Sequence, residues 1–236
     1  GSANQNTCPP GQQRPGQTVC RYDNWKDTEV VPKSDRANVF ARGTIDLSGA
    51  SSVSGEASFN QLKTKYLSTP QVAGDIGPWY ASASNTIVNI PEVLPPNNPS
   101  NPTGDYAGYR YRFTDVGNTG VDVKSNTMRF VLSGKTTVGT WDFDAGALYS
   151  QNTVDANATN QIRTSVLTKA ILDGTYNFLN PSAGKITAAQ LRVNSKDSAK
   201  SSFTIFDLKT STEFGNLPGG PIGLAAGIEY RREDRS

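Results

Sequence analysis

Two aspartates, Asp142 and Asp144, are the strongest candidates for chemistry in this chain. They lie in the run WDFDAGALYS, whose alternation of side-chain types predicts a strand with both carboxylates on one face. Paired carboxylates can hydrolyse a glycoside or bind Ca²⁺. A hydrated sheet face explains the same spacing, and we prefer that interpretation.

Other catalytic patterns are incomplete. The chain has no His, which excludes a Ser/His/Asp arrangement. Ser133–Thr136 (SGKT) ends like a phosphate loop, but Arg129 stands where that motif needs its first Gly, so we interpret the stretch as a hairpin turn. Asn157-Ala158-Thr159 fits a glycosylation sequon within a polar loop. The sequence therefore predicts neither an enzyme, a cofactor nor a metal site.

Cys8 and Cys20 are the only cysteines, and a Pro/Gly/Gln-rich segment separates them. That composition predicts a loop. A disulfide closing it would contribute about 3 kcal/mol in the chain-entropy model. The alternative, a metal site, would need more soft ligands. We expect the disulfide, and with it an oxidising compartment outside the cytoplasm.

Composition narrows the function classes. The net charge is +2 and no basic run is interleaved with aromatic residues, so we expect no nucleic-acid partner. The sequence contains no run of 18 apolar residues, so it predicts no membrane-spanning helix. The chain opens Gly1-Ser2, its only Met is Met128, and it ends just after a predicted strand. We therefore expect a fragment of a longer protein, behind a cloning scar.

The stretch Leu217–Glu233 (LPGGPIGLAAGIEYRRE) has the clearest strand pattern. After a Pro-Gly-Gly turn, one face carries large apolar residues and the other small or charged ones. The first face holds Ile222, Leu224, Ala226, Ile228 and Tyr230, and the second holds Gly223, Ala225, Gly227, Glu229 and Arg231. The eight steps from Ile222 to Tyr230 span about 26 Å. At a tilt of about 40° they cover about 20 Å of the ~25 Å apolar band of an outer-membrane barrel.

Six long strands follow from the same reading. We expect them at Arg36–Leu47, Val53–Tyr66, Tyr106–Ser133 (one strand or two), Trp141–Ser150, Ser201–Phe214 and the stretch after the Pro-Gly-Gly turn. The connections alternate short and long, with short turns at Ser48–Ser52, Gly134–Gly139 and Asn216–Pro221 and long loops at about 67–105 and 151–198. Helical spacing predicts a helix from Ile162 that Gly174 ends, and another at Ile186–Val193. Residues 1–35 form the disulfide-closed lead-in, and residues 36–236 form an all-β, antiparallel up-and-down meander, part of a transmembrane β-barrel.

Several segments resemble one protein family in order and spacing. LPGGPIGLAAGIEYRRE resembles a strand-turn-strand signature in the barrels of TonB-dependent outer-membrane receptors. Pro32–Leu47 (PKSDRANVFARGTIDL), the hairpin Val131–Tyr149 and Asp173–Pro181 (DGTYNFLNP) are similar to the same family. Together these segments span most of the chain after Cys20. No single motif among them is catalytic.

The resemblance implies a bacterial outer-membrane barrel of about 22 strands, closed by an N-terminal plug domain. Such a receptor imports a scarce nutrient (a siderophore, vitamin, carbohydrate or peptide) with energy transmitted by TonB. The expected partners are therefore this nutrient, the plug domain, TonB and outer-membrane lipid. The chain corresponds to the first part of the barrel wall, and the plug, the TonB-contacting region and the closing strand lie outside it.

Two groups of candidate residues follow from this interpretation. Residues near the loops could form a ligand vestibule: Trp79, Tyr80, Tyr106, Tyr109, Arg110 and Arg112. Loop packing explains the same residues. Residues on the polar strand faces could line the lumen and meet the plug: Asp142, Asp144, Gly223, Ala225, Gly227, Glu229 and Arg231. The alternative function class is a secreted β-sandwich that serves in binding or adhesion.

Overall fold

The computed structural model describes residues 22–76, 78–81 and 83–236. Cys8 and Cys20 lie outside these residues, and so does the predicted disulfide. Most of the predicted lead-in at residues 1–35 lies outside them too. All structural statements below concern the described part of the chain.

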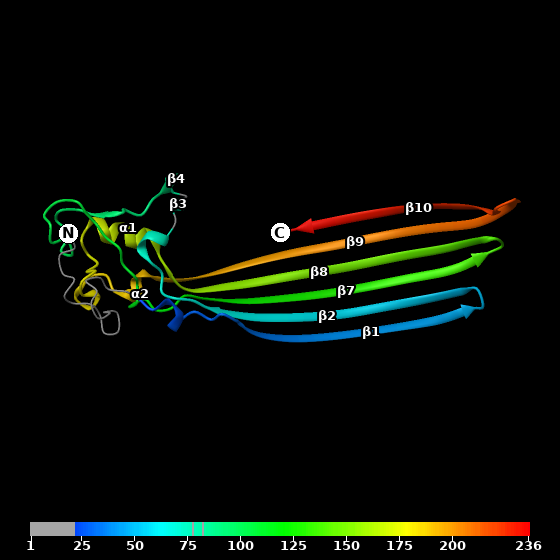
Figure 1. Ribbon diagram of the computed structural model, residues 1–236, viewed down its shortest axis with the longest axis horizontal. Helices are drawn as coiled ribbons and strands as arrows, with labels where there is room; N and C mark the ends of the chain where they lie inside the picture. The colour runs from blue at the N-terminus through cyan, green and yellow to red at the C-terminus, as the bar shows by residue number, and fades with distance from the viewer. Residues whose placement is uncertain (1–21, 77, 82) are drawn as a thin grey trace. The chain divides into compact units, whose positions relative to one another are not determined.

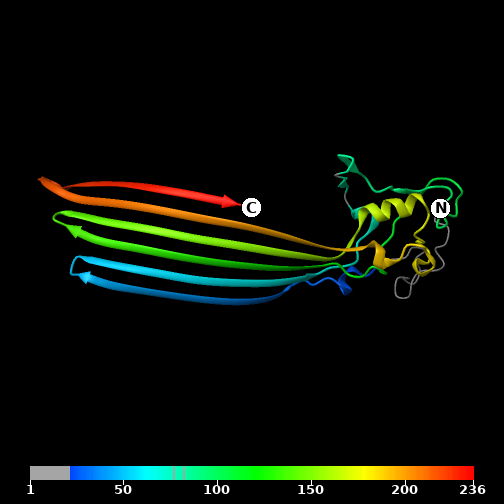
Figure 2. The ribbon, with the colours of Figure 1, turned by 180° about the vertical axis from the view of Figure 1, so that it is seen from behind.

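The fold is mostly antiparallel β, with 60% strand and 10% helix. Its main sheet has six strands in the order β1-β2-β7-β8-β9-β10, which is also their order along the chain. Figure 1 displays them side by side, and Figure 2 gives the view from behind. The strands are β1 (Lys33–Ser48), β2 (Ser51–Leu67), β7 (Gly120–Val138), β8 (Trp141–Ile162), β9 (Arg192–Leu217) and β10 (Gly220–Arg235). The prediction of six long strands in a meander is confirmed.

The short connections join β1 to β2, β7 to β8 and β9 to β10. Gly139 and Gly220 have φ values of 63° and 129°, which glycine adopts at little cost. The middle turn lies later than predicted, because residues 134–138 belong to β7. Lys135 contacts Asp144 and Thr137 contacts Asp142 across the strand pair, so the ladder continues to Val138.

The long connections also differ from their predicted ranges of 67–105 and 151–198. The first spans 68–119, because β7 begins at Gly120. The second spans 163–191, because β8 extends to Ile162 and β9 begins at Arg192. Polar residues extend these strands: Asn152 donates one hydrogen bond to Thr127 and one to Ser125 on β7, and Ser198 donates one to Asp155. Polar pairs of this kind do not produce the apolar alternation that reveals a strand in a sequence.

The stretch 106–133, which the sequence left as one strand or two, contains one long strand that begins at Gly120. Residues 109–119 instead belong to a compact unit formed by residues 22–33, 65–122 and 157–196, which we call the loop unit. Tyr111 and Phe113 pack there because their rings find other aromatic rings, at centroid distances of 5.0–6.0 Å. Between residues 109 and 119, the only strand character is the isolated bridge between Val72 and Arg112.

The loop unit contains the helices and the small sheets. Helix α1 (Thr164–Leu172) ends before Gly174, whose φ is 65°, and α2 (Ala188–Leu191) begins with a capping box of Thr187 and Gln190. Both predicted helices are thereby confirmed. The small strands and 3₁₀ turns are β3 (Trp79–Ala81), β4 (Thr86–Val88), β5 (Val93–Leu94), β6 (Ala107–Gly108), η1 (Asn24–Lys26), η2 (Ala73–Asp75) and η3 (Pro181–Ala183).

A buried core stabilises the loop unit. Both long connections and both helices contribute to it: Ala73, Ile90, Leu94, Phe113, Val116, Ile162, Leu167, Ala170, Ile171, Tyr176, Phe178 and Leu191. Phe113, Leu167, Ile171 and Tyr176 have no exposed surface. The two long connections therefore fold as one body with an interior.

The second unit, residues 34–64, 123–156 and 197–236, contains most of each long strand, and we call it the sheet unit. Among its described residues only Thr212 is buried. In the described part of the chain, no helix is both long and apolar enough to cross a membrane. The sheet unit is held by its backbone ladder and by side-chain pairs on two open faces.

Candidate functional site

One face of the sheet unit is apolar. In the register of β9 with β10, Ile222 lies opposite Phe214, Ile228 opposite Leu208 and Tyr230 opposite Phe206. The rings of Phe206 and Tyr230 stack with their centroids 6.5 Å apart. Ile228 is 73% exposed and Phe206 is 54% exposed. We call this side of the sheet the apolar face.

The apolar face continues across the other strands. A shallow depression on it is lined by Ala41, Gly55, Phe130, Tyr149 and Phe206, which come from β1, β2, β7, β8 and β9. Large apolar side chains around it are exposed: Val39, Ile45, Leu47, Phe59, Phe130, Leu132, Tyr149, Phe214 and Leu224. Contiguous exposed apolar surface of this extent marks an interaction site with another protein or with a membrane.

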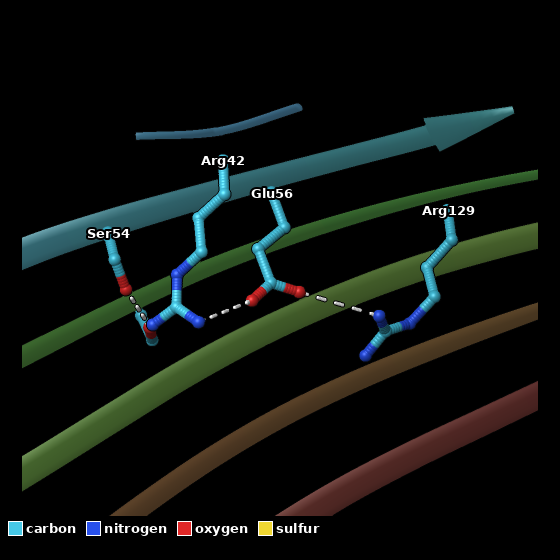
Figure 3. Close-up of polar contacts among 5 residues, drawn as sticks. Arg42, Ser54, Glu56 and Arg129 are labelled. Carbon is cyan, nitrogen blue, oxygen red and sulfur yellow. Dashed lines mark hydrogen bonds and ion pairs between the residues drawn. The ribbon is translucent and has the colours of Figure 1, made fainter. Parts of the chain in front are cut away.

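The opposite side, which we call the polar face, carries charged and hydroxyl side chains. Figure 3 shows Glu56 of β2 between two arginines, with oxygens 3.5 Å from Arg42 of β1 and 3.6 Å from Arg129 of β7. Beside them, Ser54 hydrogen bonds across to Ser133 at 2.7 Å. This network joins three neighbouring strands on one face.

Asp142 and Asp144 lie on the polar face, as predicted from their spacing. Lys135 forms an ion pair with Asp144 at 3.3 Å, and Thr137 donates a hydrogen bond to Asp142 at 2.7 Å. Each carboxylate thus has its own partner on β7. In the described residues, no three His, Cys, Asp or Glu side chains gather as metal ligands. Both carboxylates therefore take part in contacts between neighbouring strands.

The small residues of β10 lie on the same face. Gly223, Ala225 and Gly227 stand opposite Glu213, Ser211 and Lys209 of β9. A depression of about 710 Å³ lies over this part of the sheet, because the small side chains of β10 do not fill the space above it. Its lining residues include Lys135, Asp144, Lys209, Ala225 and Gly227. The polar face therefore has room for an opposing surface at this end.

Glu229 and Arg231 complete the predicted group. Glu229 stands opposite Asp207, whose carboxylate lies 3.5 Å from Lys209. Asp207 also covers Gly146 of β8, where a Cβ atom would lie 2.5 Å from its oxygen. The Arg231 guanidinium lies 4.4 Å from the centre of the Phe203 ring. Glu229 therefore has a like charge as its cross-strand neighbour.

The sequence did not single out the Glu56 network, Gly146 or Asp207. Alternation places Arg42 and Glu56 on the polar faces of their own strands. It does not say which residues of neighbouring strands meet, because that depends on the register of the sheet. Asp207 and Gly146 lie next to each other only because of that register.

The predicted vestibule residues separate into two groups in the loop unit. Tyr109 donates a hydrogen bond to the Pro91 carbonyl oxygen at 3.1 Å, and Arg112 donates to the Thr69 hydroxyl at 2.8 Å. Burial raises the pKa of Tyr109 to about 12. The hydrogen bonds of these two side chains stabilise the fold of the loop unit.

The other vestibule candidates have a different setting. Tyr106 is 69% exposed, and Arg110, on the same connection, is also exposed. Trp79 and Tyr80 belong to β3, where their backbones pair with Val88 and Ile87 of β4. The structure does not describe the side chains of Trp79 and Tyr80. Of the predicted vestibule residues, Tyr106 and Arg110 are the ones whose described side chains a ligand can reach.

A polar cluster that the sequence did not reveal lies inside the loop unit. Tyr176 donates a hydrogen bond to Asp115 at 2.7 Å, and Tyr111 donates to the other carboxylate oxygen at 3.3 Å. Burial raises the pKa of Tyr111 to about 12 and raises that of Tyr176 further. Both hydroxyls therefore keep their protons at neutral pH. The cluster links Asp115 of the first long connection to Tyr176 of the second, 61 residues later in the sequence.

Comparison of the chain with protein-family models, curated proteins and solved structures found no match.

Proposed function

We propose that this chain forms part of the wall of a transmembrane β-barrel in a bacterial outer membrane, within a TonB-dependent receptor that imports a scarce nutrient. The observation that carries the proposal is the contrast between the two faces of the six-stranded sheet. One face exposes large apolar side chains across its strands, and the other carries ion pairs and small residues.

The apolar face supports contact with lipid. In water, each large apolar side chain left exposed forgoes about 1.5–3 kcal/mol of burial free energy. Many such side chains lie on this face, among them Ile45, Leu132, Leu208 and Ile228. Hydrocarbon removes this cost without a second protein layer, and the outward faces of outer-membrane barrels are apolar for this reason.

The polar face supports contact with a hydrated interior. Glu56 and Asp144 have cationic partners on neighbouring strands, as expected for charges that line a lumen. Gly223, Ala225 and Gly227 leave the low floor where a plug domain would approach closely. The plug domain is therefore the proposed partner of this face, and TonB acts through the receptor's N-terminal region.

The connections support an orientation. Three short turns join the strands at one end, and the two long connections join them at the other. Outer-membrane barrels have short periplasmic turns and long extracellular loops. We therefore assign the loop unit to the outside of the cell, where Tyr106 and Arg110 are the candidate contacts for a siderophore, vitamin, carbohydrate or peptide.

A secreted β-sandwich is the alternative. It would need a second sheet to cover the apolar face. The other sheets of the described residues contain strands of only two or three residues. The exposed apolar face therefore favours the membrane wall.

Spin labels placed on alternating residues of β10 test the proposal. Single cysteines replace Ile222, Ile228, Gly223 or Gly227 in a Cys8→Ser/Cys20→Ser chain folded into liposomes. We expect labels at 222 and 228 to collide with oxygen, which dissolves in lipid, and labels at 223 and 227 to collide with a water-soluble nickel chelate.

Two outcomes would overturn the membrane assignment. One is equal accessibility of all four labels to the nickel chelate. The other is a parent protein that partitions into the aqueous phase and stays monomeric without detergent. Nutrient uptake is tested separately in cells, by deleting the long connection 68–119 from the parent receptor and measuring loss of binding at the cell surface.

A further inference from the structure

The loop unit contains a groove that none of the predicted site residues lines. The groove runs along helix α1 and has a volume of about 670 Å³. Its lining residues on α1 and the two helix caps recur at helical spacing: Arg163, Val166, Ala170 and Asp173. A helix rises about 15 Å from residue 163 to residue 173. These dimensions are those of a site for a small molecule.

The opposite wall of the groove comes from the segment that follows α1. The N–H of Ile186 donates to the carbonyl oxygen of Thr175 at 3.0 Å, and both residues line the groove. Gln190 of α2 continues this wall. The N–H of Arg163 donates to the carbonyl oxygen of Leu191 at 2.7 Å. Arg163 and Gln190 therefore lie near each other, at one end of the groove.

The floor of the groove is apolar. Val166 and Ile186 pack against the buried core of the loop unit and are themselves only half-buried. Ala170 and Ala189 also line the groove, and their small side chains leave space above them. A ligand with an apolar body would remove these side chains from water, which favours its binding.

Two hydrogen-bond donors at the Arg163 end have no acceptor among the described residues. The Arg163 guanidinium forms neither an ion pair nor a hydrogen bond there. The side-chain oxygen of Gln190 accepts hydrogen bonds from the N–H and the hydroxyl of Thr187, at 2.9 and 3.1 Å. This capping box directs the amide nitrogen of Gln190, with its two N–H groups, away from Thr187. Both side chains can therefore donate to a ligand.

The charges of the groove favour a ligand with a single negative charge. Lys169 and Asp173, the other charged lining residues, form an ion pair of 2.7 Å with each other. Arg163 is therefore the one unpaired charge among the residues that line the groove. A phosphate dianion would keep one charge uncompensated, whereas a carboxylate is neutralised by one guanidinium.

We propose that this groove binds a small carboxylate that has an apolar body. The carboxylate accepts hydrogen bonds from Arg163 and Gln190, and the apolar body lies on Val166 and Ile186. The inference rests on the proposed function in that it assigns the loop unit to the capture of a nutrient. It narrows the nutrient to an acidic molecule and disfavours a neutral carbohydrate.

Titration with 4-phenylbutyrate tests the site. The full chain, in detergent micelles, carries carbon-13 in the methyl groups of Val and Ile. We expect the methyl signals of Val166 and Ile186 to shift, and those of Ile87, which is 71% exposed on β4, to stay in place. The matched probe is 4-phenylbutyramide, which has the same apolar body without the charge. It should bind about tenfold more weakly.

Substitutions at the donor end test the role of the two side chains. Gln190→Glu keeps the acceptor oxygen of the capping box but replaces the donating amide by a carboxylate, so it should weaken binding of 4-phenylbutyrate about tenfold. Arg163→Gln should weaken it at least as much. The matched control is Lys185→Gln, which removes an exposed charge that does not line the groove and should leave binding unchanged. Unshifted methyl signals outside the groove establish that each variant is folded.

Three outcomes would overturn the groove as the binding site. The methyl groups of Val166 and Ile186 do not respond to 4-phenylbutyrate, the amide binds as tightly as the carboxylate, or Arg110→Gln weakens binding while Arg163→Gln does not.

The spin labels on β10 separate this inference from the proposed function. If the methyl signals respond but the labels do not alternate, the groove stands and the membrane assignment falls. If the labels alternate and the methyl signals do not respond, the groove falls and the membrane assignment stands.

Discussion

The loop unit and the sheet unit are stabilised in different ways. The loop unit buries a continuous apolar core in which Phe113, Leu167 and Tyr176 have no exposed surface. The sheet unit has a single buried side chain among its described residues, Thr212, and exposes large residues such as Ile228 on one face. The loop unit therefore contains its own interior, whereas the sheet unit depends on its surroundings to cover the apolar face.

This difference reverses the usual relation between strands and loops. Connections are normally the mobile, solvated part of a protein, and a regular sheet provides its core. Here the aromatic rings of the two long connections pack at centroid distances of 4.9–6.0 Å, while the long strands carry their apolar residues outward. We therefore expect the cost of a substitution to depend on the region in which it lies and, on the apolar face, on contact with lipid.

The largest expected effect is in the core of the loop unit. Phe113→Ala should lower the free energy of unfolding of that unit by about 3–5 kcal/mol, because it removes a fully buried ring. Hydrogen exchange of the α1 amides measures this loss. The matched control, Phe206→Ala, removes a ring that is 54% exposed on the sheet and should change exchange in α1 by less than about 0.5 kcal/mol. An equal effect of both substitutions would contradict the separation of the two regions.

The next effect should depend on the solvent. Ile228→Arg should destabilise the chain by about 2–4 kcal/mol in liposomes, the cost of a charge near the centre of a bilayer. Its neighbour on the other face, replaced as Glu229→Arg, should cost far less. Urea unfolding in liposomes and in mild detergent measures both variants. Equal costs for the two arginines would mean that the apolar face does not contact lipid.

A third test concerns the polar cluster inside the loop unit. Tyr176→Phe removes the hydroxyl that donates to Asp115 at 2.7 Å and should cost about 2 kcal/mol, the scale of a hydrogen bond to a charged group. Tyr106→Phe is the control, because that side chain is 69% exposed. Thermal unfolding followed by near-ultraviolet circular dichroism distinguishes them. A loss confined to Tyr106→Phe would refute the role of the cluster.

Alkaline pH should weaken the same region by a smaller amount. Burial raises the pKa of Tyr109 and Tyr111 from 10.0 to about 12, so the folded unit holds these protons more tightly than the unfolded chain. The stabilisation is complete below pH 10 and is lost as the pH rises through 12. At pH 11 we expect a loss of about 1 kcal/mol, after allowance for the exposed part of each ring. Phenolate absorbance at 295 nm, recorded with the unfolding midpoint, checks the sign.

The smallest effect is expected on the polar face. Glu56→Gln removes ion pairs of 3.5 and 3.6 Å with Arg42 and Arg129, whose side chains are 60% and 45% exposed. Its cost should stay below about 1 kcal/mol and decrease with added salt. Ser54→Ala, which removes a neutral hydrogen bond, should show no such dependence on salt. A large, salt-independent loss for Glu56→Gln would mean that the polar face is dry.

The sequence by itself determined the strands and their faces. Alternation along β10 identified Ile222, Leu224 and Ile228 as one face and Gly223, Ala225 and Gly227 as the other, and the register with β9 agrees. Spacing also predicted α1, with Gly174 after its end. These features depend on residues close together in the chain, so a local pattern is sufficient to reveal them.

The tertiary structure decided which distant residues meet. It placed Tyr109, Tyr111 and Phe113 in an interior, although their alternation resembles that of a strand, because Tyr176 and Phe178 lie beside them. It also brought Glu56 to Arg129 and Asp207 to Gly146 through the register of the sheet. Register and burial depend on partners more than 60 residues away, as for Tyr111 and Tyr176 with a separation of 65. A local pattern contains no information about such partners, because the free energy that selects them is gained only when the chain has folded.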